Sequence, residues 1–346
     1  MSTPPKIAAL FLIFAAFTAT AEEPRLLTWE GHTMGTIYSV KIAGVTPDEK
    51  LAASLRAAVE KRLDEINRQM SHYQPDSELS RFSNSTSTAP FKVSAEFAHV
   101  MRHSLEVNRD SGGAFDPTLG PLINLWGFGQ NGITGRVPSD EDIAAAQIKC
   151  GGSHVHVTAN DELQKDIPEL QLNLSGVAKG YGADEASRAL RERGYTNVFV
   201  AVCGEIVASG VNPDGQPWHV AIERPLYEIE HGAELTAIVP LSDRALSTSG
   251  DTHNFFRDAG GRVFAHILDP ATGRPVSNNV ASVTVIAPNG LTADSLTKPL
   301  YILGVERGLR WIESRPDTAA LFIIRDESGH LRLVPSKRFP NLEILK

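Results

Sequence analysis

The sequence predicts an α+β fold, with mixed and largely antiparallel sheets packed against helices. Many strand-like runs in the second half of the chain are separated by short turns rather than by helices, which favours antiparallel pairing over a doubly wound parallel sheet. The chain shows no fixed-period repeat and no long linker. We therefore expect residues 22–346 to form one domain, either as a single unit or as two lobes.

The helices are predicted from caps and apolar spacing. Thr46 is expected to cap a helix whose apolar residues recur at near-helical spacing from Leu51 to Met70. Ser94 is expected to cap a second helix, which Gly112-Gly113 ends. Further helical segments are predicted over residues 139–147 and 176–194, from residue 291, and near 305–313.

The strands are predicted from runs of β-branched and aromatic residues. The first follows the N-terminal segment, and most of the others lie in the second half of the chain. Their ranges are 36–42, 197–202, 206–209, 218–223, 235–240, 263–268, 281–287, 320–325 and 331–335.

Composition limits the classes of partner. The chain has 346 residues, of which 42% are hydrophobic, and its formal net charge is −8. That length and apolar content allow a sizeable core. An acidic protein lacks the basic surface that phosphate backbones require, so nucleic acid is excluded as the main partner.

The N-terminus has the pattern of an export signal. Lys6 precedes an apolar run over residues 7–17, and Ala19-Thr20-Ala21 resembles a cleavage site. The run is short for a membrane span, although a buried N-terminal helix or an uncleaved anchor remain alternatives. On this pattern we expect residues 1–21 to be a cleaved signal and the mature protein to be periplasmic. Because no cysteine lies near the cleavage site, we expect no lipid anchor.

The two cysteines and a histidine pair leave alternatives open. Cys150 and Cys203 form a disulfide or stay as two free thiols, since export permits either state. His154 and His156 lie two residues apart and are either metal ligands together with Cys150 or surface histidines. Surface histidines are the better interpretation, because no second clustered pair of ligands is present.

Two segments suggest a site for a phosphate and a hard cation. Residues 172–180 join a strand to a helix, where free N–H groups favour a phosphate and Lys179 would add charge. Ser175 as an ordinary N-cap with a solvated Lys179 is the alternative. Asp294 and Thr297 share a helix face, and their oxygens suit Mg²⁺ or Ca²⁺, although they equally fit a plain helix start.

A set of short segments, taken in order, resembles the ApbE-type flavin transferases. Each segment is weak alone, and together they span nearly the whole mature chain. They are Thr33-Met34-Gly35-Thr36, Met70-Ser71-His72-Tyr73, Ser77-Glu78-Leu79-Ser80-Arg81-Phe82, residues 113–118, 172–180, Ser247-Thr248-Ser249-Gly250-Asp251, residues 266–273 and 293–297.

The resemblance implies an enzyme that binds FAD and Mg²⁺ and transfers FMN to a Thr or Ser hydroxyl of a target protein, releasing AMP. It places the flavin nucleotide against Met34, Tyr73, Ala114, Phe115, Asp116, Asn173, Lys179 and Ile267. The metal would be held by the Gly176 carbonyl, Asp294 and Thr297. Lys179 and Mg²⁺ would stabilise charge on the pyrophosphate.

His266 is the candidate general base, because histidine titrates near neutral pH. A structural histidine at a strand end is the competing interpretation.

The sequence departs from the family pattern near the metal. Asn173 stands where the family often has Asp, and Lys298 stands where many members have Thr. The family also commonly has a Gly pair where this chain reads Cys203-Gly204. Lys298 would add positive charge that partly replaces the metal, so metal affinity is affected more than FAD binding.

Two functions of different classes follow. The first is FMN transfer to an exported electron-transport subunit. The second is flavin binding or trafficking, with FAD pyrophosphatase activity or little catalysis.

Overall fold

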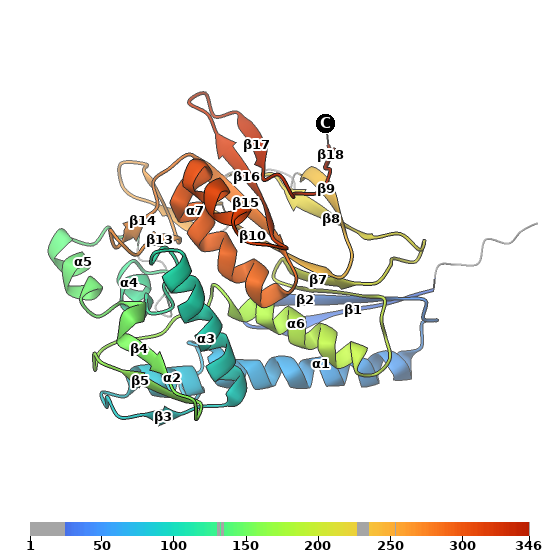
Figure 1. Cartoon of the computed structure of the whole chain (residues 1–346), viewed down its shortest axis with the longest axis horizontal. Helices are drawn as coiled ribbons and strands as arrows, with labels where there is room; N and C mark the ends of the chain where they lie inside the picture. Colours follow the sequence, from blue (N-terminus) through green and yellow to red (C-terminus); the bar gives the residue numbers. More distant parts are fainter. Residues whose placement is uncertain (1–24, 130–131, 133–134, 227–234, 253, 346) are drawn as a thin grey trace, which may run out of the picture.

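The computed structural model describes residues 25–129, 132, 135–226, 235–252 and 254–345. The predicted signal over residues 1–21 lies outside these ranges. An eight-stranded sheet forms the centre of the molecule, and each of its neighbouring strand pairs is antiparallel (Figure 1). In spatial order it comprises β1 (Leu26–Thr33), β2 (Thr36–Ala43), β6 (Val198–Val202), β7 (Glu205–Ser209), β10 (Arg244–Gly250), β15 (Val280–Ala287), β16 (Ala319–Arg325) and β17 (Leu331–Pro335).

Smaller sheets and hairpins surround the central sheet. One three-stranded sheet has the order β18-β9-β8 and another has the order β3-β5-β4. Their strands and those of two hairpins are β8 (Trp218–Glu223), β9 (Leu235–Leu241), β18 (Glu343–Ile344), β3 (Phe91–Lys92), β4 (Val155–Val157), β5 (Glu162–Lys165), β11 (Phe255–Arg257), β12 (Val263–Ala265), β13 (Leu268–Asp269) and β14 (Arg274–Pro275).

Helices cover one face of the central sheet. Figure 1 shows α7 lying across β10 and β15, with α6 and α1 beneath it. The helices are α1 (Glu49–Met70), α2 (Glu78–Asn84), α3 (Ala95–Asp110), α4 (Gly120–Leu125), α5 (Asp140–Gln147), α6 (Ala178–Arg191) and α7 (Gly290–Glu313), with one turn of 3₁₀ helix over Gly152–His154. The predicted α+β class is confirmed. No helix of the described ranges is long and apolar enough to cross a membrane.

Apolar residues fill both faces of the sheet. On one side, Leu55, Val59 and Leu63 of α1 pack in a buried cluster with Val40 of β2 and Val200 of β6. A helical spacing of apolar residues places them on one stripe, as predicted. On the other side a separate cluster joins the central sheet to β8 and β9. The molecule therefore has three layers, with helices, the main sheet and a small sheet in that order.

Two predicted boundaries differ from the structure. Asp48 rather than Thr46 caps α1, because the Asp48 carboxylate accepts from Leu51 N at 2.7 Å. The strand predicted over residues 263–268 is divided between β12 and β13, because β12 pairs with β11 whereas β13 pairs with β14. The helical segments predicted from 291 and near 305–313 are the two parts of α7, which is kinked at Gly304 with φ 70°.

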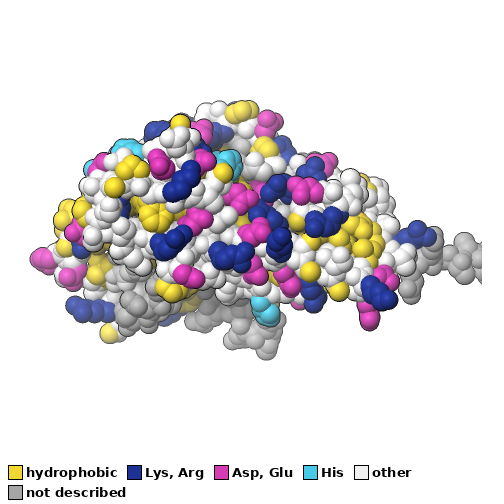
Figure 2. Space-filling view, turned by 90° about the horizontal axis from the view of Figure 1, so that it is seen from below, with side chains coloured by type: hydrophobic (Ala, Val, Ile, Leu, Met, Phe, Trp, Pro, Cys, Tyr) yellow, Lys and Arg dark blue, Asp and Glu magenta, His cyan; other side chains and the backbone are white. Residues whose placement is uncertain are grey.

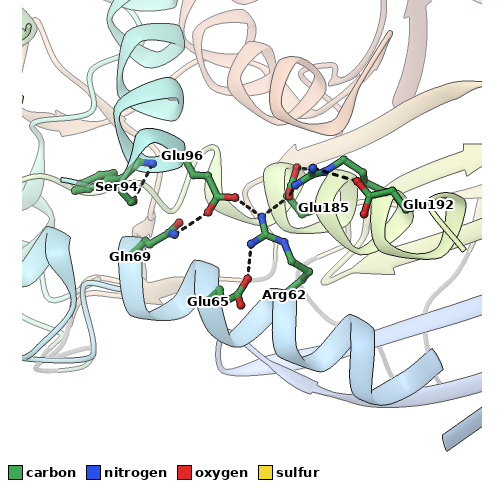
Figure 3. Close-up of polar contacts among 9 residues, drawn as sticks. Arg62, Glu65, Gln69, Ser94, Glu96, Glu185 and Glu192 are labelled. Atoms are coloured by element: carbon green, nitrogen blue, oxygen red, sulfur yellow. Dashed lines mark hydrogen bonds and ion pairs between the residues drawn. The ribbon is translucent and has the colours of Figure 1, made fainter. Parts of the chain in front are cut away.

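An arginine links three helices. Arg62 of α1 donates to Glu65 of the same helix, to Glu96 of α3 at 2.6 Å and to Glu185 of α6 (Figure 3). Arg188 also donates to Glu185. Charge-assisted bonds of this kind are stronger than neutral ones. The network holds α1 and α3 against α6, which begins at the site described below.

Charged side chains of both signs share the surface. Figure 2 shows the molecule from below, and basic and acidic side chains are interspersed over that face. A continuous basic field, which nucleic-acid backbones require, is not seen there.

Candidate active site

A cavity of about 1000 Å³ gathers segments that lie far apart in the sequence. This volume suits a large organic ligand. Its lining includes every residue that the sequence assigned to the flavin nucleotide, together with the predicted base and one predicted metal ligand. These are Met34, Tyr73, Ala114, Phe115, Asp116, Asn173, Gly176, Lys179, His266 and Ile267.

Two turns supply one part of the lining. Met34 and Gly35 form the turn between β1 and β2, and both have left-handed backbones, with φ 51° and 72°. A two-residue turn of this hand matches the twist of a hairpin. After α1, Tyr73 is 61% exposed and its ring lies 4.0 Å from the ring of His72. Burial, with a smaller effect of the Lys179 charge, lowers the pKa of His72 to about 4, so its imidazole is neutral at pH 7.

Asp116 organises the segment after α3. Its Oδ1 accepts from Thr118 N at 2.8 Å and from Thr118 Oγ1 at 2.6 Å, and its Oδ2 accepts from Gly152 N at 3.2 Å. Burial raises the pKa of Asp116, and these hydrogen bonds oppose the rise. The carboxylate thus fixes the turn that presents Ala114 and Phe115 to the cavity.

The start of α6 points toward Asp294. Asn173 Oδ1 accepts from Ser175 N at 3.0 Å, while α6 is capped by Val177, with no side-chain cap bond among the described residues. The alternative in which Ser175 caps this helix is therefore wrong. Gly180 N, in the first turn, donates instead to Asp294 Oδ2 at 3.1 Å.

Lys179 lies at the polar centre of the cavity. Its Nζ donates to Ser175 O at 2.9 Å and lies 3.5 Å from Glu205 Oε1. Burial would lower the pKa of Lys179, but the carboxylates of Glu205 and Asp294 outweigh it and raise the pKa. The ammonium is therefore charged at every pH at which the protein would work.

Glu205 is a candidate residue that the sequence analysis did not assign. It is 4% exposed, it lines the cavity, and its Oε2 has no hydrogen-bond partner among the described residues. Burial raises its pKa to about 7, against the opposing charge of Lys179. The β6–β7 turn of Cys203 and Gly204, with φ 53° and 89°, positions it. The departure from the family pattern at Cys203-Gly204 marks this segment in the sequence, but it does not single out Glu205.

The predicted metal ligands lie together, and a lysine lies among them. Asp294 and Thr297 are fully buried behind the cavity wall. Lys298 Nζ donates to Asp294 Oδ1. Thr297 Oγ1 donates to Asp294 O and pairs with Ser249 Oγ, both at 2.8 Å. Burial would raise the pKa of Asp294, but the charges of Lys298 and then Lys179 lower it.

The protonation pattern of His266 suits a base. Its Nδ1 lies 3.2 Å from Asn254 O. Because a carbonyl oxygen only accepts, Nδ1 bears the proton in the neutral ring and Nε2 is the acceptor. In this tautomer, Nε2 is the nitrogen that a general base would use to take the proton of a hydroxyl.

The histidine pair lies at the surface of the molecule. Nδ1 of His154 and Nε2 of His156 lie 3.6 and 3.2 Å from Asp166 Oδ2, on an exposed patch. Within the described ranges no group of three or more His, Cys, Asp or Glu is arranged to hold a metal. Cys150 and Cys203 are free thiols.

The family model of the ApbE family matches residues 34–322. The chain belongs to the ApbE family. It is 39% identical over 334 residues to the FAD:protein FMN transferase of Vibrio cholerae, covering 96% of this chain and 97% of that protein. With the FAD:protein FMN transferase of Salmonella typhimurium it shares 37% identity over 339 residues, covering 96% and 95%.

Solved ApbE structures share the fold. The flavin transferase ApbE from Vibrio cholerae has a TM-score of 0.82 at 38% identity, covering 91% of this chain and 98% of that one. The apo form of the Pseudomonas stutzeri flavinyl transferase ApbE has a TM-score of 0.79 at 35% identity, covering 91% and 95%. The cavity lies within the matched residues of this ApbE family member.

The predicted magnesium ion does not fit the donors as this ApbE chain arranges them. Mg²⁺ needs near-octahedral oxygen ligands and dehydrates reluctantly. Here Oδ1 and Oδ2 of Asp294 accept from Lys298 and Gly180 N, and the Thr297 hydroxyl is bonded to Ser249. An ammonium beside the carboxylate would also repel a divalent ion.

Proposed function

We propose that this protein is a FAD:protein FMN transferase that moves FMN from FAD to a Thr or Ser hydroxyl of a target protein and releases AMP. Membership of the ApbE family and the names of its relatives support flavin transfer from FAD. The main structural support is a single cavity that joins Lys179 and His266.

The reaction is an attack on phosphorus. The hydroxyl oxygen of the acceptor bonds to the FMN phosphorus, the pyrophosphate P–O bond breaks, and AMP leaves with the bonding electrons. His266 Nε2 accepts the hydroxyl proton, while the Asn254 carbonyl holds the ring in the required tautomer. Lys179 stabilises the negative charge that grows on the phosphate oxygens.

The magnesium dependence implied by the family resemblance stays a prediction. Its predicted ligands are Asp294, the Gly176 carbonyl and Thr297. Because this donor set does not fit the ion as arranged, the proposed reaction is described only through residues of the chain.

The partner and the location are also part of the proposal. We propose that the acceptor is an exported electron-transport subunit, because residues 1–21 have the pattern of an export signal. Removing these residues should retain the protein in the cytoplasm, which cell fractionation measures. An acceptor found only in the cytoplasm would contradict this part of the proposal.

The test is mass spectrometry of a target protein after incubation with FAD, performed with Mg²⁺ and with a chelator. The added mass of FMN on a Thr or Ser is the expected result. His266→Asn should reduce the rate at least about 100-fold, the usual range for a lost general base. His330→Asn, an exposed histidine on the β16–β17 turn, is the matched control.

The same experiment separates the alternatives. Free FMN and AMP with an unlabelled target would identify a pyrophosphatase instead. Bound FAD that stays intact would identify a flavin-binding or trafficking protein.

A further inference from the structure

We propose that the ε-ammonium of Lys298 is the resident cation of the pyrophosphate site in this chain, so that FAD binds without a divalent metal ion. The inference rests on the proposed function, because it takes FAD as the substrate. It concerns a position at which this chain departs from the family pattern.

The first support is the position of the ammonium. Lys298 follows Asp294 by four residues, so the two side chains lie on the same face of α7. Lys298 Nζ donates to the Asp294 carboxylate and lies 3.5 Å from Asp294 O. The carboxylate is fully buried, whereas Lys298 lines the cavity. The ammonium therefore lies between Asp294 and the space that the ligand would fill.

The second support is the path of the lysine stem. A Cβ added at Gly176 would lie 3.3 Å from Lys298 Cε and 3.6 Å from its Cδ. The stem thus packs directly against Gly176, whose carbonyl is the second predicted metal ligand. One lysine side chain contacts two of the three positions at which the metal was predicted.

The third support is the direction of the remaining hydroxyl. Thr297 Oγ1 donates to Asp294 O, so its bond with Ser249 must use the Ser249 proton. Thr297 is fully buried and does not line the cavity. Its oxygen is hydrogen-bonded to Asp294 O of α7 and to Ser249 of β10, and the residue does not line the cavity.

The fourth support is the balance of charge. The buried Asp294 contacts Lys298, and the buried Glu205 lies 3.5 Å from Lys179, so each acidic group has a lysine beside it. Buried charges are tolerated when they are paired in this way. A lysine is also an established point-charge partner of phosphate. The pyrophosphate of FAD would accordingly meet two lysines that are already held in place.

The inference is tested by FAD binding, measured by quenching of flavin fluorescence after dialysis against a chelator, and again with added Mg²⁺. For the unaltered protein we expect dissociation constants within about threefold of each other, whereas loss of a required cation would cost about tenfold or more, as for any lost contact with a charged group. Lys298→Thr, which restores the residue common in the family, should bind FAD at least about tenfold more weakly in chelator and recover with Mg²⁺.

Matched variants keep the result interpretable. Lys298→Arg retains the charge and should stay independent of metal. Lys298→Gln removes the charge at similar length and should lose affinity in chelator, so it replaces the threonine variant if that one misfolds. Lys61→Thr, an exposed lysine of α1, should behave like the unaltered protein. Mn²⁺ binding followed by electron paramagnetic resonance should reveal a new site in Lys298→Thr that the unaltered protein lacks.

Two outcomes would overturn the inference in distinguishable ways. If the unaltered protein loses tenfold or more of its FAD affinity in chelator, Lys298 is not the resident cation, although the proposed function stands. If FAD binds under neither condition, the proposed function fails along with the inference.

Discussion

At the scale of single residues, the cavity is organised by opposite charges placed in contact. Lys179 and Glu205 are 26 residues apart in the sequence, yet their side chains lie close together. Asp294, which accepts from Gly180 N, comes from a third segment. In the first turn of α6, Gly180 N donates to Asp294, while the neighbouring Lys179 side chain lies beside Glu205. The start of one helix thus connects both acidic groups.

Lys179→Met tests the role of this ammonium. The variant keeps the length of the side chain and removes its charge, so we expect FAD affinity to fall at least about tenfold, since a hydrogen bond to a charged group contributes about 1.5–3 kcal/mol. Titration calorimetry measures the change. Unchanged affinity, in a variant whose circular dichroism is normal, would remove Lys179 from the phosphate site.

At the scale of elements, α6 and α7 determine where the polar groups lie. The two helices cross so closely that a Cβ at Gly180 would lie 2.1 Å from Gly290 O and 2.7 Å from Asp294 Cβ. Asp184 of α6 also accepts from Gly290 N at 2.7 Å and Leu291 N at 2.8 Å, at the start of α7. The glycine contact and this cap together hold Asp294 against the first turn of α6.

Gly180→Ala should disturb this crossing. The added methyl group overlaps the backbone of α7, so we expect a loss of about 1–3 kcal/mol in the free energy of unfolding. Urea denaturation measures it. Gly260→Ala is the control, because its Cβ would meet only Asp258 Oδ1, at 3.3 Å in an exposed turn. Equal effects of the two substitutions would contradict the close crossing.

The contact between α3 and α7 predicts a dependence on pH. His103 Nε2 lies 2.9 Å from Ser295 Oγ, and burial, aided by the charges of His99 and Arg315, lowers the pKa of His103 to about 4. The folded state therefore binds fewer protons than the unfolded state between pH 4 and 6.5. The stability contributed by neutral His103 is full above pH 6.5 and is lost as the pH falls toward 4.

His103→Gln should reduce this acid sensitivity. Glutamine keeps a hydrogen-bond donor and does not titrate, so between pH 6.5 and 4 the variant should lose about 2 kcal/mol less than the unaltered protein. Urea unfolding at a series of pH values measures the slope. Parallel curves for the two proteins would show that His103 titrates normally in the fold.

At the scale of the whole molecule, the cavity draws on the turn after β1, the segments after α1 and α3, the start of α6, and β10. A ligand that contacts all of them binds the folded state only. FAD at 100 times its dissociation constant should therefore raise the free energy of unfolding by about 2.7 kcal/mol. This should appear as a rise of about 4 °C in the melting temperature, because the entropy of unfolding grows with chain length. Absence of a rise at saturating FAD would contradict the assigned cavity.

Much of this arrangement could be predicted from local patterns. The stripe from Leu55 to Met70 and the cap at Ser94 are determined by neighbouring residues, and both appear as predicted. The N-cap of α1 was predicted two residues too early, because Thr and Asp are both common N-cap residues and the sequence does not distinguish Thr46 from Asp48. Strand β10 was missed because its Ser and Thr residues resemble a loop, although they are buried between β7 and β15.

The site could be predicted only where a motif marked it. Lys179 and His266 lie in recognisable segments, and both line the cavity, while their chemical roles stay predictions. Glu205 could not be assigned, because its burial and its contact with Lys179 arise from the packing of β7 beside α6. The pairing of Lys298 with Asp294 required the helix, which places residues four apart side by side.

The β6–β7 turn has a practical consequence. Cys203 is exposed and lines the cavity, whereas burial raises the pKa of the Cys150 thiol to about 12 and suppresses its reactive thiolate. A maleimide dye should therefore attach to one position of the unmodified chain, beside the cavity. A dye on Cys203 would then report when a ligand enters or leaves the cavity, without the need to introduce a cysteine by mutation.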